Sequence, residues 1–317
     1  MSRILIIGAA GQIGTELTEQ LALQYGNDNI VAADLNPPDK QPEIRDYVKL
    51  DVLDKKALTD LVKQHQITEI YNLAAVLSAT AEQIPEKAWN INMNGLFNVL
   101  EVAREFDLDK VFWPSSIAVF GESTPKTDTP QQTVAEPSTV YGISKLAGER
   151  WCEFYHRKYG VDVRSIRYPG LISYKALPGG GTTDYAVDIY YKAVAEKPFT
   201  CFVNADTRLP MMFMSDAVRA TIELMQAPAN SLTVRSSYNL TGFSLSPEDA
   251  ATSIRRHYPD FEVRYEPDYR EQIARSWPQS IDDSIARRDW GWKHEYDLEK
   301  MTDVMLRELS ASKVNSV

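Results

Sequence analysis

Short apolar runs alternate with longer amphipathic stretches through the first half of the chain. The apolar runs predict strands at residues 3–7, 30–34, 47–50, 69–74, 110–115 and 163–168. Between them, apolar residues recur every three or four positions and predict helices at 13–25, 55–65, 85–106 and 138–159. Strands that are apolar throughout and separated by helices are typical of a parallel sheet covered on both faces. Because parallel crossovers are right-handed, we expect an α/β fold with a doubly wound, Rossmann-type parallel sheet.

Beyond residue 168 the predicted elements are shorter and mixed. A loop is predicted over 177–183, a helix over 184–196, and isolated strands at 200–203, 238–240 and 262–265. A further helix begins after Ser246, because serine is a good N-cap and Pro247 suits the first helical position. The polar tail at 309–317 is predicted to fray.

This change of pattern predicts two domains. The length of 317 residues exceeds one ordinary domain of roughly 100–200 residues. We expect residues 1–170 to form a nucleotide-binding domain and residues 171–317 to form mainly a smaller, C-terminal substrate-binding domain. Within the second part, residues from about 203 to 228 are expected to pack back onto the first domain.

Composition narrows the class of protein. With 44% hydrophobic residues the chain has ample material for a core, and 44 acidic against 34 basic side chains give a net charge of −10. Such a chain, without a basic run, is a poor binder of nucleic acid or anionic membranes. No apolar stretch approaches the roughly 18 residues that span a bilayer, and because residues 1–3 lead directly into the first predicted strand we expect no signal peptide. Two cysteines and four scattered histidines form no disulfide framework or metal motif, so we expect a cytoplasmic protein without a metal.

Three glycines, Gly8, Gly11 and Gly14, follow the first predicted strand and open the first predicted helix. Gly8 would permit a tight turn, Gly11 would let the backbone reach a pyrophosphate, and Gly14 would let the helix pack close to the sheet. Amides at the helix N-terminus would then hold the pyrophosphate. The spacing is GxxGxxG rather than GxGxxG, and alone it also fits a glycine-rich turn without a ligand.

Acidic and small residues at the ends of the next strands extend this nucleotide site. Asp34 ends the second strand, where a carboxylate can accept hydrogen bonds from the adenosine ribose hydroxyls. The same charge would repel a 2′-phosphate, which favours NAD over NADP. Asp51 and Val52 are placed to meet the adenine, and residues 73–75 are small enough for a cofactor to lie against the backbone. A turn aspartate before Asn-Pro-Pro is the alternative interpretation of Asp34.

Tyr141 and Lys145 are spaced to share one face of a predicted helix. A phenol has a pKa of about 10, and a nearby ammonium stabilises the phenolate and lowers that pKa toward working range. Ser115 and Ser116 end the fifth predicted strand, where a hydroxyl can orient a substrate oxygen toward the tyrosine. Taken alone, the pair also fits a solvated helix face and the serines fit a turn.

In this order the motifs resemble the extended short-chain dehydrogenase/reductase family over nearly the whole chain. The segments that carry the resemblance include 8–14, 72–75, 92–95, 115–121, 141–145 and 167–170. The resemblance implies a catalytic group of Ser116, Tyr141 and Lys145, with Ser116 favoured over Ser115 by its register. It also implies NAD in an extended pose against Gly8, Gly11, Gln12, Ile13, Gly14, Asp34, Leu35, Asp51, Val52, Leu73, Ala74, Ala75, Asn92, Tyr141, Lys145, Tyr168 and Leu171.

Other segments show a closer resemblance within that family, to the short-chain L-threonine 3-dehydrogenases. They are 77–78, 163–176, 181–187, 209–214 and 277–278, whereas the three consecutive glycines at 179–181 depart from that group's pattern and leave the loop geometry open. The resemblance implies NAD-dependent oxidation of the β-hydroxyl of L-threonine. It places the amino acid against Leu77, Ser78, Ser115, Ser116, Tyr141, Gly181, Thr182, Thr183 and Trp277. It further implies a homodimer in which helices 85–106 and 138–159 pair between subunits.

Two other functions fit parts of the same sequence. A nucleotide-sugar epimerase or dehydratase would use the same tyrosine and lysine but keep its NAD and show no net redox change. That site needs basic groups for a diphosphate, and the segment 179–184 offers none. A non-catalytic NAD-binding regulator is the second alternative, and the intact set of Ser116, Tyr141 and Lys145 argues against it.

Overall fold

Six parallel strands form the central sheet, in the order β3-β2-β1-β4-β5-β7. They are β1 (Ile4–Ile7), β2 (Ile30–Asp34), β3 (Asp46–Lys49), β4 (Glu69–Asn72), β5 (Lys110–Phe112) and β7 (Val163–Arg164). The chain runs outward from β1 to β3 and then returns to β4, so the strand order reverses at β1. This computed structural model describes residues 2–36, 46–175 and 179–314, and it confirms the predicted doubly wound parallel sheet.

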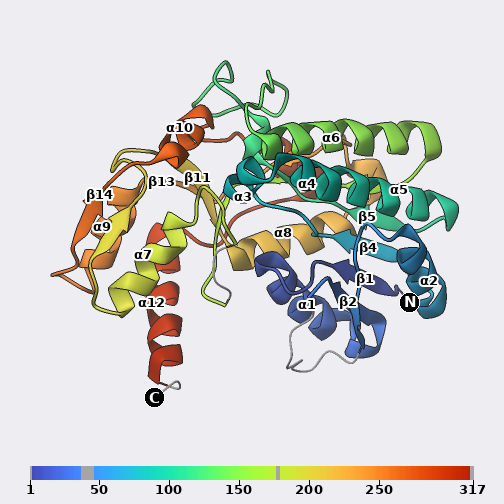
Figure 1. Cartoon of the computed structure of the whole chain (residues 1–317), viewed down its shortest axis with the longest axis horizontal. Helices are drawn as coiled ribbons and strands as arrows, with labels where there is room; N and C mark the ends of the chain where they lie inside the picture. The colour runs from blue at the N-terminus through green and yellow to red at the C-terminus, as the bar shows by residue number, and fades with distance from the viewer. Residues whose placement is uncertain (1, 37–45, 176–178, 315–317) are drawn as a thin grey trace.

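Helices cover both faces of this sheet (Figure 1). One face carries α1 (Gln12–Tyr25) and α8 (Met214–Gln226), which pack against each other, and the other carries α2 (Lys55–His65), α5 (Gly95–Glu105) and α6 (Val140–Tyr159). Alternate side chains of β1 point to opposite faces: Ile4 and Ile6 join the core under α1 and α8, and Leu5 and Ile7 join the other core. Burial on both sides explains why these strands are continuously apolar.

The later elements gather at one end of the sheet (Figure 1). Three small sheets accompany the central one. The first contains β6 (Ser115–Ser116), β8 (Ile166–Tyr168) and β12 (Tyr238–Asn239), and the second contains β9 (Gly170–Ile172), β11 (Leu209–Phe213) and β13 (Phe243–Leu245). The third contains β10 (Phe199–Cys201) and β14 (Val263–Tyr265). The remaining helices are α7 (Tyr185–Val194), α9 (Pro247–Arg255), α10 (Tyr269–Ser276), α11 (Ser284–Trp290) and α12 (Leu298–Val314). Helices α7, α9 and α12 pack together around a separate apolar core.

Several sequence predictions differ from the structure in detail. The strands predicted over 110–115 and 163–168 are each divided, the first into β5 and β6 and the second into β7 and β8. The single helix predicted over 85–106 is divided into α4 (Pro85–Trp89), a π-helix (Asn90–Asn94) and α5, and a short helix α3 (Ser78–Gln83) precedes it. The tail predicted to fray from residue 309 instead continues α12 to Val314, because Met305 and Leu309 are buried in the core with α7 and α9. Residues 315–317, and the start of the loop predicted at 177–183, lie outside the described residues.

The structure confirms the helix predicted after Ser246, which is α9, and confirms Ser246 as its N-cap. The Ser246 hydroxyl accepts from the amide of Asp249 at 3.2 Å, and the Asp249 carboxylate accepts from the amide of Ser246 at 3.0 Å. This reciprocal arrangement is a capping box, and Pro247 occupies the first turn as expected. In the part of the chain that the structure describes, no helix is long and apolar enough to cross a membrane.

Replacing Ser246 with alanine removes the hydroxyl that accepts from the amide of Asp249 and leaves the other hydrogen bond of the capping box in place. We expect the free energy of unfolding to fall by about 1 kcal/mol, measured by urea denaturation. Ser284→Ala is the matched control, because Ser284 is an exposed residue at the start of α11. A change of no more than about 0.5 kcal/mol is expected there. Equal effects of the two substitutions would contradict the capping role.

Candidate active site

A cavity of about 610 Å³ opens at the edge of the sheet where the strand order reverses. Ligands of open α/β sheets bind at this position, outside the carboxyl ends of the strands. Most of the residues selected from the sequence meet in its wall: Gly8, Gly11, Gln12, Ile13, Gly14, Leu73, Ala75, Leu77, Ser78, Ser115, Ser116, Tyr141, Lys145, Tyr168, Leu171, Gly181, Thr182, Thr183 and Trp277. They come from loops and strand ends that are far apart in the sequence.

Six other selected residues lie outside this wall: Asp34, Leu35, Asp51, Val52, Ala74 and Asn92. Asp34 is next to it, since its Oδ2 accepts from the amide of Ala10, which lines the cavity, at 3.0 Å. Asp51 uses its carboxylate to accept from the amide of Leu53 at 2.9 Å. Leu35 is exposed, and Val52 is buried in the core beside α2 and α5.

Asn92 lies behind the wall, in the π-helix Asn90–Asn94. Its Oδ1 accepts from the amide of Val76 at 2.8 Å, and its Nδ2 donates to the carbonyl of Val76 and to Ser144 Oγ, both at 3.2 Å. Because Val76 lines the cavity, Asn92 fixes the backbone of the wall. Short π-helices of this kind are frequent at functional sites, and the sequence gives no periodicity signal for one.

The three glycines of the first loop meet different demands. Gly8 has φ +83°, and a Cβ on it would lie 2.9 Å from the amide nitrogen of Ala74. A Cβ on Gly14 would lie 2.2 Å from the carbonyl oxygen of Gly8. The fold itself therefore requires glycine at both positions. A Cβ on Gly11 would meet that oxygen at an ordinary 3.4 Å, so the chain leaves a recess there that a side chain would fill. Such a recess beside a helix N-terminus fits a pyrophosphate.

Tyr141 lies in the first turn of α6 and faces Ser116 across the cavity wall. Burial raises the pKa of its phenol to about 12, and a hydrogen bond with Ser116 acts in the opposite direction. Ser116 also accepts from the amide of Ala118 at 3.2 Å. The hydroxyl that lowers the pKa of the phenol is thus that of Ser116, and the lowering expected from Lys145 stays a prediction.

Lys145 is buried one turn further along α6. Its Nζ donates to the carbonyl of Pro114 at 2.6 Å and lies 4.5 Å from the ring centroid of Trp113 and 5.4 Å from that of Tyr141. Burial lowers the pKa of the ammonium to about 7, although the nearby charge of Glu149 raises it. Aromatic faces stabilise a cation at such distances, so the site is built to hold this group in place.

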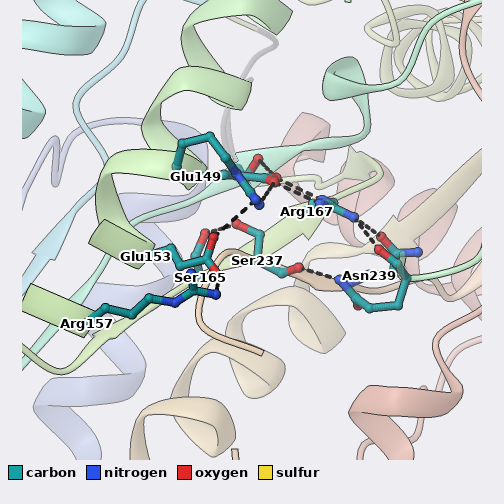
Figure 2. A network of polar contacts seen from close by, with 10 residues as sticks. Glu149, Glu153, Arg157, Ser165, Arg167, Ser237 and Asn239 are labelled. Carbon is teal, nitrogen blue, oxygen red and sulfur yellow. Dashed lines mark hydrogen bonds and ion pairs between the residues drawn. The ribbon is translucent and has the colours of Figure 1, made fainter. Parts of the chain in front are cut away.

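Glu149 of α6 and Arg167 of β8 form a buried ion pair (Figure 2). Arg167 donates from Nε and Nη2 to the two carboxylate oxygens of Glu149, both at 2.8 Å, and Ser115 Oγ donates to the same carboxylate at 2.7 Å. Nη1 of Arg167 donates to Asn239 Oδ1 at 3.0 Å and to the carbonyl of Gln131 at 3.1 Å. Glu149 is completely buried and follows Lys145 by one turn, so this spacing was available in the sequence as a signal.

The loop before α7 forms the opposite wall. The Ser78 hydroxyl accepts from the amide of Thr182 at 3.2 Å and lies 3.2 Å from its hydroxyl, which joins this loop to the start of α3. Asp184, which the sequence reasoning did not select, also lines the cavity. Apart from Lys145 it is the one charged side chain in the described wall. Among residues 2–36, 46–175 and 179–314 there is no cluster of three or more metal-ligating side chains.

Comparisons with known proteins place this cavity in a family context. A model of the NAD dependent epimerase/dehydratase family matches residues 4–240. The chain is similar to an L-threonine dehydrogenase from Cupriavidus necator, solved in a holo form, with 56% identity, a TM-score of 0.95 and 97% and 99% of the two chains covered. It is similar to a monomeric L-threonine 3-dehydrogenase from a metagenome, with 50% identity, a TM-score of 0.95 and 98% and 99% covered. It is also 50% identical over 309 residues, 96% of each chain, to an epimerase/dehydratase of Staphylococcus saprophyticus described as uncharacterized.

Glu149→Gln tests the buried ion pair. The substitution leaves the Arg167 guanidinium buried without a charged partner, and we expect the free energy of unfolding to fall by about 3 kcal/mol or more. Glu153→Gln on the same helix is the control, because its partners Arg150 and Arg157 are exposed and such pairs contribute about 1 kcal/mol or less. Urea denaturation measures both. A loss for Glu149→Gln no larger than the control would contradict the arrangement.

Proposed function

The chain belongs to the NAD dependent epimerase/dehydratase family, and we propose that it oxidises the β-hydroxyl of L-threonine to give 2-amino-3-oxobutanoate. That membership confirms the family resemblance of the sequence. NAD is the cofactor, and the proposal places it along Gly8, Gly11 and Gly14 with Asp34 toward its ribose. The choice of L-threonine as the substrate rests on full-length similarity to L-threonine dehydrogenases, at up to 56% identity in the structures compared above.

The wall of the cavity supports a small zwitterion over a nucleotide sugar. The N-terminal amides of α1 are assigned to the pyrophosphate of NAD, so the second diphosphate of a nucleotide sugar would need arginine or lysine side chains elsewhere in the cavity. Among the residues that the structure places around the cavity, Lys145 is the only basic one, and the proposal assigns it to the ribose of NAD. The amides of Gly180, Gly181 and Thr182 are engaged by Asp184 and Ser78, and the proposal assigns the amino acid to the other polar groups of the 179–184 loop, the Thr183 hydroxyl among them, without an arginine. The proposed pocket consists of Leu77, Ser78, Ser116, Tyr141, Gly181, Thr182, Thr183 and Trp277.

In the proposed reaction Tyr141, as phenolate, removes the hydroxyl proton of threonine while the hydrogen on C3 leaves as hydride. The carbon–oxygen single bond becomes a carbonyl, and the proton stays on the Tyr141 oxygen. NAD, when bound, supplies the acceptor for the hydride. Ser116 orients the reacting oxygen, since its hydroxyl faces the phenol whereas that of Ser115 is engaged by Glu149. Lys145 holds the cofactor ribose. As part of this proposal the protein acts in the cytoplasm, in threonine breakdown.

A direct assay tests this function and the base. Purified protein with L-threonine and NAD is expected to form NADH, followed by absorbance. Because a raised phenol pKa must be overcome to form the base, kcat/KM should increase with pH from neutral to alkaline values. Tyr141→Phe should lower kcat by about 100-fold or more.

Two outcomes would contradict the proposal in different ways. No NADH with threonine, together with interconversion of a nucleotide sugar, would assign the epimerase class instead. Full turnover by Tyr141→Phe would refute the base. The control is Tyr269→Phe, since Tyr269 is 52% exposed at the start of α10 and lies outside the cavity wall.

We also propose a homodimer formed through the outer face of α5 and α6. Trp151 and Phe154 of α6 are each 39% exposed, and the ring centroid of Trp151 lies 4.9 Å from that of Phe97 on α5. Neighbouring exposed aromatic side chains of this kind suit an interface between two subunits. The similar metagenomic protein is described as monomeric, so the oligomeric state must be measured for this chain.

Light scattering during size exclusion is expected to give about twice the chain mass of 35.8 kDa. Trp151→Glu places a charge in the aromatic surface, where its desolvation is unfavourable, and should yield the monomer. Leu23→Glu, at a 79% exposed position on α1, should leave the dimer intact. A monomeric wild type would overturn this assignment without affecting the reaction.

A further inference from the structure

Asp184 occupies the N-cap position of α7 but does not cap it. An aspartate at this position ordinarily accepts from an amide in the first helical turn. Here the carboxylate makes no capping hydrogen bond and turns back toward the preceding loop. Its Oδ2 accepts from the amides of Gly180 at 2.9 Å and Gly181 at 2.7 Å. One oxygen therefore holds two consecutive amides of the loop, and the second of them belongs to Gly181, which lines the cavity.

The loop geometry is matched to this contact. Gly180 has φ +93°, and a Cβ on it would lie 2.5 Å from Thr80 Oγ1. A Cβ on Gly181 would lie 2.8 Å from Oδ1 of Asp184 itself. The sequence did not define the geometry of the three glycines at 179–181. In the structure they allow the two amides to converge on the carboxylate. On its other side the loop is held by the bonds between Thr182 and Ser78.

The ionised carboxylate is unfavourable for the fold. Burial raises the pKa of Asp184 to about 6, the two amides and Arg270 of α10 lower it, and Asp188 of α7 adds to the rise. A carboxyl whose pKa is raised on folding stabilises the fold while it is protonated. That contribution is lost as the pH rises through about 6. A group that costs stability in its ionised form is expected where function requires the charge.

We propose that Asp184 is a positioning residue, whose ionised carboxylate clamps the amides of Gly180 and Gly181 and thereby sets Gly181, Thr182 and Thr183 in place for the amino acid substrate. This inference rests on the proposed function. Charge-assisted hydrogen bonds are roughly twice as strong as neutral ones, so protonation weakens both contacts at once. The loop then samples other positions, and binding of the substrate weakens while the reacting groups at Tyr141 stay in place.

The substitution Asp184→Asn tests the clamp, since it keeps the shape and removes the charge. At pH 7.5 and saturating NAD, the KM for L-threonine should rise about tenfold or more with kcat within about threefold. In the wild type KM should rise as the pH falls below about 6, and in the variant KM should stay flat over that range. Protonation of the Tyr141 base would instead lower kcat and leave KM unchanged.

Hydrogen exchange supplies a readout that does not need catalysis. In the wild type the amides of Gly180 and Gly181, corrected for the intrinsic dependence on pH, should lose protection between pH 7.5 and 5. In Asp184→Asn they should be weakly protected at both. The thermal stability of the variant relative to the wild type should increase from pH 5 to pH 8, because the variant lacks the cost of ionisation. A merely structural carboxylate would give the opposite trend.

Asp188→Asn is the matched control. It makes the same chemical change one turn along α7, at a carboxyl whose pKa burial also raises. We expect KM at pH 7.5 to be unchanged. The midpoint of the rise in KM should move to lower pH, because a like charge near Asp184 has been removed.

The outcomes separate the clamp from the proposed function. If the wild type oxidises threonine and Asp184→Asn matches it in both KM and exchange, the clamp is overturned and the function stands. If threonine is not oxidised but exchange follows Asp184 as described, the clamp holds and the proposed function fails. A variant with reduced kcat and unchanged KM would also overturn the positioning role.

Discussion

The buried carboxylate of Glu149 fixes the relative position of three elements on which the site depends. It lies on α6, the helix that carries Tyr141 and Lys145, and it accepts from Ser115 on β6 and Arg167 on β8. Ser115 and Arg167 are themselves opposite each other in the pairing of these two strands. Because a buried charge is tolerated only with its partners in place, a shift of α6 along the strands would leave Arg167 unsatisfied. The distance between the phenol and Ser116 is therefore set by an interaction behind the cavity, outside any contact with a ligand.

Much of the fold could be predicted because its signals are local. Burial on both faces makes the strands continuously apolar, and the Ser246 cap depends on residues within one turn. The errors arise where tertiary contacts decide. The helical end of α12 is stabilised by packing on α7 and α9, and an isolated polar segment shows none of this. The π-helix at Asn90–Asn94 contains Asn92, whose contact with Val76 no period of apolar residues encodes.

The residues of the site also fall into those that local sequence signals predict and those that they do not. Gly8, Gly14, Tyr141 and Lys145 could be selected because turn, packing and helix spacing constrain them within a few positions. Glu149 and Asp184 were missed although each is close in sequence to selected residues. Asp184 has the sequence signature of an ordinary cap. Its contact with the amides of Gly180 and Gly181 accompanies a positive φ at Gly180, which the sequence pattern does not reveal. The roles of the selected residues toward NAD and threonine stay predictions until the assays are made.

Gly11 has a different status from its two neighbours in the first loop. The chain needs glycine at Gly8 and Gly14 to fold, whereas the surroundings of Gly11 would accommodate a methyl group. The fold therefore does not itself require glycine at this position, and any requirement for it would come from a bound group. We expect a chain with alanine in place of Gly11 to keep its fold, while the added methyl group fills the recess beside the N-terminus of α1. Comparing such a chain with the wild type would separate the stability that comes from contacts within the protein from the stability that comes from binding the cofactor.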